Sequence, residues 1–374
     1  MNIPSMRPYL PKEDVDEIKE GFEAILRSGK LTLGPYTERF EREFARYTGV
    51  KHAIAANSGT CTLEMIYRSI GVREREVVTP TNTHIATSNA VIFAGGKPVL
   101  AEMDGETLCL DLSDALSKVN ANTKAVVVVH IGGLIHPQIK ELQEACSKLG
   151  IDLVEDAAHA HGATKNDQKA GSFSRAASFS FYPAKVITSV EGGMITTNDD
   201  LIAEEARSLR NHGNDKRGLQ VRLGYNWRMS ELHSLLGLTQ LRRIEEIIKL
   251  KNRVARLYDE YFEPAEGVCT IKTPTDSRNS YYKYPVKLNR GADVGSITQT
   301  LKAKFGIDTG SLYFPPCHLQ PVYMEMFGYA PGDFPVAEDV LARTITLPIY
   351  AGMSDSEVAY VAESLLATVK ARSK

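Results

Sequence analysis

Short apolar runs alternate with amphipathic helical stretches over most of this chain, and this alternation limits the possible folds more than any other feature. Residues Ala125–Val129 form a continuous apolar run, which is typical of a parallel strand buried on both faces. A helical pattern over 137–149 follows, and then a second strand over 151–156. This order predicts a mostly parallel sheet covered by helices, with functional groups at the carboxyl ends of the strands.

The length of 374 residues allows one large and one small domain, on the usual scale of about 100–200 residues each. A long helical pattern runs to about Phe262, and the chain leaves the large domain within it. We therefore predict a large domain over 1–246 and a small domain over 247–374. The charge run Arg242–Glu246 in this pattern is interpreted as a solvated helix face.

Charge and cysteine content exclude several classes of protein. The net charge of −2 gives no broad attraction for phosphate backbones, so nucleic-acid binding is not expected as the main task. The N-terminal residues lack the apolar core of a signal peptide, and no run approaches the ~20 apolar residues that span a bilayer. Five scattered cysteines without a CxxC pair are interpreted as reduced packing residues, and a cytoplasmic location is expected. They are Cys61, Cys109, Cys146, Cys269 and Cys317.

Lys185 stands between a short apolar strand at 178–181 and a glycine-tight turn at 191–193. A lysine that is partly desolvated near cationic or electron-poor partners can lose its proton near neutral pH and form a Schiff base with a carbonyl. Most lysines are solvated surface charges, so the pattern alone leaves both interpretations open.

Two further motifs follow predicted strands. After the strand 52–56, Asn57–Thr60 leads into a helix, where free N–H groups and hydroxyls can receive an anion or can simply cap the helix. Asp156 ends its strand and offers a counter-charge, a helix cap or a structural ion pair. His159 and His161 lie two residues apart without a third suitably spaced ligand, so we expect no metal site.

Five motifs in the same order resemble the DegT/DnrJ/StrS family of sugar aminotransferases over nearly the whole chain. They are Asn57–Thr60, Glu155–His159, Ser178–Lys185, Glu191–Gly193 and Gly224–Ser230. The resemblance implies an α/β fold like that of aspartate aminotransferase (fold type I), with a mostly parallel seven-stranded sheet in the large domain and a smaller C-terminal α+β domain. It also implies the cofactor pyridoxal 5′-phosphate (PLP) and a homodimer with active sites at the interface.

The same resemblance implies a role for each matching residue. Lys185 would form the Schiff base with PLP and, once displaced by the incoming amine, shuttle a proton between substrate and cofactor. Asp156 would keep the pyridine nitrogen protonated, because an ionised carboxylate there keeps the ring an electron sink. His159 would lie next to the cofactor's phenolic oxygen. The phosphate would be bound by Gly59, Thr60 and Ser180, and by Asn226 of the neighbouring subunit.

The chain departs from the family pattern at two positions. His84 stands where the family commonly has an aromatic residue that stacks on the pyridine ring, so the stacking platform would be imidazole. Val190 replaces a common glycine, so the loop after Lys185 is expected to differ in path. Near the C-terminus, residues 313–321 resemble the family's loop over the sugar, which implies substrate contacts for Tyr313 and His318.

The expected function is amino transfer from an amino acid, L-glutamate in our interpretation, to a keto group on a nucleotide-activated deoxysugar. A PLP-dependent sugar dehydratase of the same family is an alternative, although those members usually replace the Schiff-base lysine with histidine. A non-catalytic PLP-binding regulator is another, although no basic patch or DNA-binding module accompanies the intact motifs. The sequence leaves open which sugar, nucleotide and ring carbon are involved.

Overall fold

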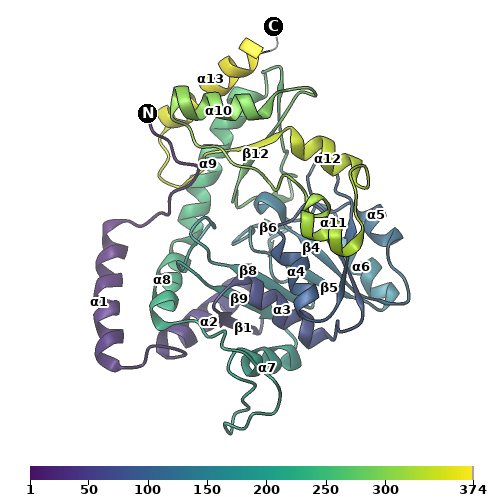
Figure 1. The fold of residues 1–374 in the computed structure, drawn as a ribbon. Helices are drawn as coiled ribbons and strands as arrows, with labels where there is room; N and C mark the ends of the chain where they lie inside the picture. Colours follow the sequence, from purple (N-terminus) through teal and green to yellow (C-terminus); the bar gives the residue numbers. More distant parts are fainter. Residues whose placement is uncertain (373–374) are drawn as a thin grey trace.

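The computed structural model describes residues 1–372, and a seven-stranded sheet lies at its centre (Figure 1). The strands are ordered β1-β9-β8-β5-β4-β2-β3, and β9 is antiparallel to both of its neighbours while β8, β5, β4, β2 and β3 run parallel. The predicted sheet, with its seven strands, is therefore confirmed. Its strands are β1 (His52–Ala56), β2 (Glu76–Pro80), β3 (Lys97–Ala101), β4 (Thr123–Val129), β5 (Asp152–Asp156), β8 (Ala176–Ser180) and β9 (Gly193–Thr197).

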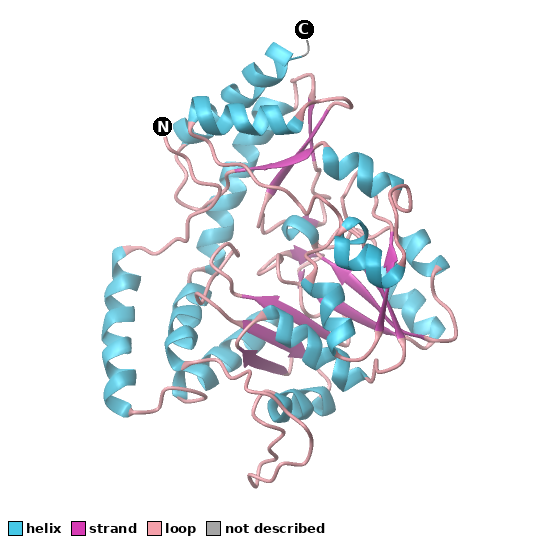
Figure 2. Cartoon of the chain, viewed as in Figure 1, coloured by secondary structure: helices cyan, strands magenta, loops and turns pink. Residues whose placement is uncertain are grey.

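Alternate residues of the strands other than β3 enter two separate cores, one on each face of the sheet. On β4, Val126 and Val128 pack into the first core, and Ala125 and Val127 pack into the second. Strand side chains point alternately to the two faces, so a continuous apolar run is what a strand covered on both sides requires. Figure 2 shows helices on both sides of the magenta strands.

The helices that cover the sheet divide between these two cores. The first core takes side chains from α2 (Pro35–Thr48), α6 (Ile139–Leu149) and α8 (Glu231–Arg242), and the second from α3 (Gly59–Ile70), α4 (Ala86–Phe93) and α7 (Asp200–Leu209). Helix α1 (Lys12–Ser28) packs along α8, and the short α5 (Leu112–Ser117) adds Ala115 to the first core. Within residues 1–372, no helix combines the length and the apolar character needed to cross a membrane.

A third core lies in the C-terminal part of the chain. It joins the antiparallel sheet β10-β12-β13 to three helices and also includes Ile3. The predicted boundary at 246/247 falls inside the first of these helices and stays a prediction. The elements are α9 (Ile244–Phe262), β10 (Val268–Thr270), β12 (Tyr284–Leu288), α10 (Val294–Phe305), β13 (Thr344–Leu347) and α13 (Asp355–Arg372).

A fourth core connects the C-terminal part to the sheet. Helices α11 (Pro321–Phe327) and α12 (Pro335–Ala342) pack against Leu100 and Val129, near the ends of β3 and β4. The loop before α11 therefore runs beside the carboxyl edge of the sheet. The remaining elements are the 3-10 turns η1 (Ile131–Gly133) and η2 (Cys317–Leu319) and a small sheet of β6 (Thr164–Lys165), β7 (Gln168–Lys169) and β11 (Ser277–Arg278).

The long helix predicted up to Phe262 is two helices in the structure. The chain breaks at Arg243, which lies between α8 and α9. The guanidinium of Arg243 pairs with Asp14 of α1 at 3.0 Å and with Glu246 at 3.2 Å. The interpretation of the charge run Arg242–Glu246 as a solvated helix face is therefore incomplete. Its Arg243, at the junction of α8 and α9, attaches α1 to the large domain.

Candidate active site

A cavity of about 340 Å³ lies at the carboxyl ends of the parallel strands. Ligand pockets of open α/β sheets form at this edge, and this volume is within the usual range for a small ligand. Eight of the ten residues singled out from the sequence line this cavity. They are Gly59, Thr60, His84, Asp156, His159, Ser180, Lys185 and Tyr313.

The turn from β1 into α3 forms one wall of the cavity. Ser58 caps α3, because its hydroxyl accepts the N–H of Cys61 at 3.2 Å. The first N–H groups of a helix have no partner within the helix, so this end can receive an anion. Gly59 has to be glycine here, since a Cβ would lie 2.8 Å from the Cβ of Ser180. The sequence left capping and anion binding open, and the structure is compatible with both.

Lys185 lies in the loop that joins β8 to β9. The loop is closed by hydrogen bonds from Phe181 N–H to the Gly192 carbonyl (2.8 Å) and from Ser189 N–H to the Phe181 carbonyl (3.0 Å). Val190 has φ of +70° and is 50% exposed, so this valine takes the left-handed conformation that favours glycine. The expectation that this loop differs in path remains untested, but the glycine-like backbone angle is present.

The ammonium of Lys185 faces Asp156 and the ring of Tyr282. Burial lowers the pKa of Lys185 from its ordinary value to about 8, Asp156 opposes that change, and Lys283 adds to it. The Nζ atom lies 4.5 Å from the centroid of the Tyr282 ring. A substantial fraction of this amine can therefore be unprotonated near neutral pH, which is what nucleophilic attack on a carbonyl requires.

Asp156 is held by hydrogen bonds on both of its carboxylate oxygens. Thr87 donates to Oδ2 at 2.7 Å, and the N–H of Ala158 donates to Oδ1 at 3.1 Å. The hydroxyl of Thr83 lies 2.6 Å from that of Thr87. Because the proton of Thr87 is used toward Asp156, Thr83 is the donor of this second bond.

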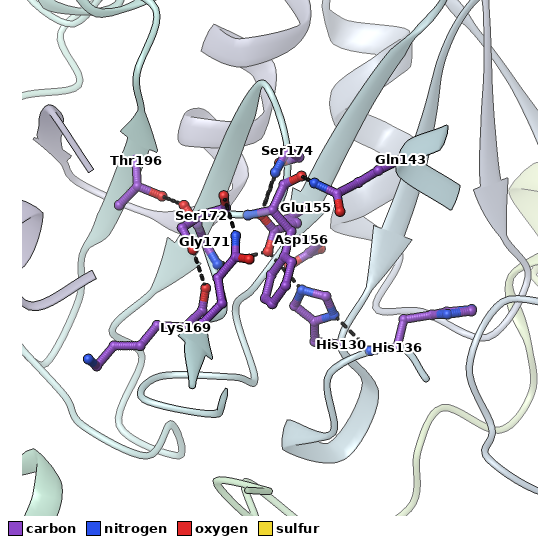
Figure 3. A network of polar contacts seen from close by, with 12 residues as sticks. His130, His136, Gln143, Glu155, Asp156, Lys169, Gly171, Ser172, Ser174 and Thr196 are labelled. Atoms are coloured by element: carbon purple, nitrogen blue, oxygen red, sulfur yellow. Dashed lines mark hydrogen bonds and ion pairs between the residues drawn. The ribbon is translucent and has the colours of Figure 1, made fainter. Parts of the chain in front are cut away.

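A second carboxylate, Glu155, fixes the other face of the same strand end. Its oxygens accept the N–H groups of Gly171 (2.8 Å) and Phe173 (2.9 Å) from the segment that leads into β8. His130, just after β4, donates from Nε2 at 2.9 Å, because its Nδ1 accepts the N–H of His136. Figure 3 shows Glu155 between Gly171 and His130. One buried side chain therefore ties the ends of β4 and β5 to the start of β8.

His159 belongs to a group of aromatic side chains that line the cavity. It stacks on Tyr282 with centroids 4.2 Å apart, and its Nε2 lies 2.8 Å from the hydroxyl of Tyr313. Its Nδ1 accepts the N–H of Gly132 at 3.3 Å, so the ring proton resides on Nε2. Burial lowers the pKa of His159, and also that of His84, which contacts the Tyr313 ring edge to face at 5.6 Å. These imidazoles are therefore neutral at physiological pH.

Two of the ten predicted residues lie outside the cavity. Asn226 is exposed on the segment before α8, where it pairs with Asn211. His318 is completely buried, and its Nδ1 lies 2.7 Å from Thr81 Oγ1 while its Nε2 lies 3.0 Å from Glu338 Oε1. Both ring nitrogens are used inside the protein, so His318 does not have the cavity position expected of a substrate contact.

Three residues at the site were not found from the sequence: Thr87, Tyr282 and Lys283. Thr87 follows Thr83 by one helical turn, a spacing that places two side chains on the same side of a helix start. Tyr282 and Lys283 come from the segment before β12, more than 90 residues after Lys185. Only the folding of the C-terminal part brings Tyr282 to the cavity wall, with Lys283 beside its ring, and no local pattern indicates that.

The residues of the cavity fit PLP in shape and chemistry. The amine of Lys185, with its lowered pKa, suits the aldehyde of PLP. The carboxylate of Asp156, with its fixed orientation, suits the pyridine nitrogen, and the N-terminus of α3 suits the phosphate. The glycine at position 59 lets the start of α3 approach Ser180 closely, so both residues can lie at the cavity wall.

Comparisons with known proteins agree with this fold. The sequence model of the DegT/DnrJ/EryC1/StrS aminotransferase family matches residues 12–366. The GDP-perosamine synthase of Vibrio cholerae is 33% identical, over 94% of this chain and 95% of the relative. The solved structure of Helicobacter pylori PseC, an aminotransferase involved in the biosynthesis of pseudoaminic acid, has a TM-score of 0.92 at 29% identity, covering 99% of this chain and 100% of PseC.

A further solved structure, Spr1654 of Streptococcus pneumoniae in its PLP form, has a TM-score of 0.92 at 26% identity and covers 99% of both chains. The fold is that of a PLP-dependent aminotransferase. The chain belongs to the DegT/DnrJ/EryC1/StrS aminotransferase family. The family resemblance, the cofactor and the aspartate aminotransferase-like fold predicted from the sequence are confirmed.

Proposed function

We propose that this chain transfers an amino group from L-glutamate to a keto group of a nucleotide-activated deoxysugar, with Lys185 as the covalent lysine. The observation that carries the proposal is one cavity in which the amine of Lys185, with its pKa lowered to about 8, faces the carboxylate of Asp156. Bound PLP supplies an electron-poor ring and an aldehyde that can carry an amino group.

In this proposal, Asp156 pairs with the pyridine nitrogen and Lys185 moves a proton at its Nζ. The ion pair needs a carboxylate whose position does not change, and the bonds from Thr87 and Ala158 supply that. The proton transfer needs an amine that can alternate between its two protonation states near neutral pH, which the lowered pKa of Lys185 allows.

The remaining walls would bind the other parts of PLP. Gly59, Thr60 and Ser180 would hold the phosphate at the N-terminus of α3. His84 would cover one face of the pyridine ring as a neutral imidazole, and the Nε2–H of His159 would donate to the phenolic oxygen. This last contact would replace the present bond between His159 and Tyr313.

We propose a homodimer in which Asn226 completes the phosphate site of the neighbouring subunit. Asn226 is exposed and does not line the cavity of its own chain. The preceding loop exposes three apolar side chains, Leu219, Val221 and Leu223, the last at 96%. Apolar exposure of this kind is typical of a surface that another subunit covers.

The nucleotide-sugar acceptor is supported by the name of the GDP-perosamine synthase to which this chain is similar. Tyr313, at the cavity wall, is the residue we expect to contact the sugar. Five free cysteines, four of them buried, support a location in the reducing cytoplasm. A dehydratase of the same family is less well supported because Lys185 is intact, and a non-catalytic regulator is less well supported because Lys185 and Asp156 face each other.

The half-reaction with the donor tests the proposal directly. We expect a visible absorbance band when PLP is added, and its conversion to the pyridoxamine form by excess L-glutamate without any sugar. The Lys185→Ala variant should bind PLP without the band and should not transaminate. A normal turnover in that variant, or a band that glutamate leaves unchanged, would contradict the proposal.

Mixing two inactive variants tests the shared site. Subunits with Lys185→Ala and subunits with Asn226→Ala should each be inactive at a low PLP concentration. In mixed dimers one site has both residues intact, so random mixing should restore about one quarter of the sites. No recovery after verified subunit exchange would argue that Asn226 does not act across an interface.

A further inference from the structure

The rings of Tyr225 and Trp227 stack face to face in the segment that precedes α8. Their centroids lie 3.8 Å apart, and their planes are inclined by 5°. The guanidinium carbon of Arg68, on α3, lies 5.2 Å from the centroid of the Tyr225 ring. Stacked rings attract each other and a cation is attracted to the face of a ring, so these three side chains form one unit, here called the aromatic stack.

Arg68 is held in place by two further contacts. Its guanidinium pairs with the carboxylate of Glu64 at 2.7 Å, and its Nη2 donates to the Phe93 carbonyl at 2.6 Å. Glu64 is buried and lies one helical turn before Arg68 on α3. The cationic end of the aromatic stack is therefore fixed to two helices of the large domain.

The backbone of the stacked residues is extended and paired with the segment 209–211. The N–H groups of Tyr225 and Trp227 donate to carbonyls of that segment at 2.7 Å and 3.0 Å, and Asn226 forms an antiparallel bridge with it. Successive side chains of an extended segment point to opposite sides. Because Tyr225 and Trp227 both enter the aromatic stack, the side chain of Asn226 between them points away from it.

The segment is connected to the cavity of its own chain by a backbone contact only. The N–H of Asn57 donates to the Trp227 carbonyl at 3.0 Å, and Asn57 begins the turn that brings Gly59 and Thr60 to the cavity wall. This bond needs no aromatic ring. The side chain of Asn226, in contrast, is exposed and does not line the cavity of its own chain, so its direction matters only to another molecule.

We propose that the aromatic stack positions Asn226: it fixes the direction of this side chain in advance, so that Asn226 reaches the phosphate site of the neighbouring subunit without further ordering. The inference rests on the proposed homodimer, in which Asn226 completes that site. A side chain on a loose segment would have to be ordered when the phosphate binds, and this ordering would lower the affinity. Tyr225 is therefore a positioning residue, which acts on the cofactor through Asn226.

The first measurement is the affinity for PLP of variants that break the aromatic stack. In Tyr225→Leu the ring is lost, and the Kd for PLP should rise about tenfold because the hydrogen bond from Asn226 to a charged phosphate is lost. Tyr225→Phe keeps the ring and should bind PLP like the parent. Trp227 is the sole tryptophan of the chain, so a change in its fluorescence verifies that Tyr225→Leu has broken the stack.

Mixing with Lys185→Ala subunits then shows which cavity the stack serves. The PLP absorbance band is read at a PLP concentration between the Kd of the parent and that of Tyr225→Leu. In a mixed dimer the Tyr225→Leu subunit supplies Lys185 and receives a correctly positioned Asn226 from its partner. We expect random mixing to give a parent-like site in about one quarter of the sites.

A second variant keeps the test independent of the folding of Tyr225→Leu. Arg68→Gln removes the cation from the Tyr225 ring, keeps both rings, and retains an amide that can donate to Glu64. Its Kd for PLP should rise less than that of Tyr225→Leu, and mixing with Lys185→Ala subunits should restore the parent affinity in the same one quarter of the sites.

The outcomes separate the possible failures. No band in the parent would overturn the role of Lys185. No recovery when Asn226→Ala and Lys185→Ala subunits are mixed, after verified exchange, would overturn the shared site and this inference with it. Recovery in that mixture but none with Tyr225→Leu and Arg68→Gln would overturn this inference alone, because the stack would then serve its own cavity. A parent-like Kd in Tyr225→Leu, with the fluorescence change present, would also overturn it.

Discussion

Thr87 donates a hydrogen bond of 2.7 Å to Oδ2 of Asp156, and it belongs to the helix that begins directly behind the cavity wall. Replacing Thr87 by valine preserves shape but removes the donor. We expect Thr87→Val to weaken PLP binding about tenfold, or ~1.4 kcal/mol, because the carboxylate loses a fixed orientation and a charge-assisted bond. Equilibrium dialysis against PLP measures this. Thr87→Ser keeps the hydroxyl and should bind PLP as tightly as the parent. If Thr87→Val also bound PLP as tightly as the parent, the role of Thr87 in orienting Asp156 would be contradicted.

Val190 holds a backbone angle that suits glycine, with φ of +70°. A β-branched side chain is strained there, and half of this one is exposed, so little packing is lost when it is removed. We expect Val190→Gly to raise the free energy of unfolding by about 1 kcal/mol. Urea denaturation measures this free energy. Val190→Ala should raise it by less than Val190→Gly does, because alanine keeps a Cβ. A loss of stability in the glycine variant would show that the valine side chain contributes more than its strain costs.

His318 connects Thr81 to Glu338 and does not line the cavity. His318→Leu leaves both partners without their bonds, so we expect the free energy of unfolding to fall by about 2 kcal/mol. The KM for the sugar acceptor should stay within about twofold, since no substrate contact is removed. Glu338→Gln retains an acceptor oxygen and should lose less stability. A large rise in KM with unchanged stability would restore His318 as a substrate contact.

Lys251 makes the stability of the protein depend on pH. Burial lowers its pKa from 10.5 to about 7. Between these values the unfolded chain holds a proton that the native chain has released, so this group makes stability rise with pH. Below pH 7 both states are protonated and the native state bears the full cost of the buried charge.

Lys251→Met removes that dependence. We expect the variant to be more stable than the parent by about 2 kcal/mol at pH 6.5, with the difference shrinking as pH approaches 10. Urea denaturation midpoints of the variant and the parent, determined at pH 6.5 and at pH 10, measure this difference in stability. Lys249→Met on the exposed face of the same helix should show no such trend. If the extra stability of Lys251→Met grew with pH, the lowered pKa of Lys251 would be contradicted.

Much of the site could be predicted because it is encoded in short segments. Gly59 and Lys185 follow strands and Asp156 ends one, and the carboxyl ends of parallel strands meet at one edge, so the fold brings these segments together. The two-residue strands β6, β7 and β11 could not be predicted, because segments this short carry no periodic pattern.

The roles of residues that act through tertiary contacts could not be predicted from the sequence. Glu155 was quoted only as part of a motif, and its link to His130 depends on two strands lying side by side. His318 matched a loop motif, but its burial follows from the packing of α11 and α12, which was not predicted. Tyr282 reaches the cavity wall, with Lys283 beside its ring, only when the C-terminal part has folded.

Ile3 joins the two ends of the chain in one core. Its N–H donates to the Gly306 carbonyl at 2.8 Å, and its carbonyl accepts the N–H of Asp308 at 2.9 Å. Its side chain belongs to the same core as Val358 and Leu365 of α13. Figure 1 shows the N-terminal segment beside α13. During synthesis, the strands of the large sheet are complete once residue 197 has left the ribosome. The C-terminal core cannot form before α13 has been synthesised. Ile3, one of the first residues made, therefore acquires its core partners last. Tyr282, whose ring centroid lies 4.5 Å from the Nζ of Lys185, arrives in that final stage, so this wall of the cavity is complete only in a fully translated chain.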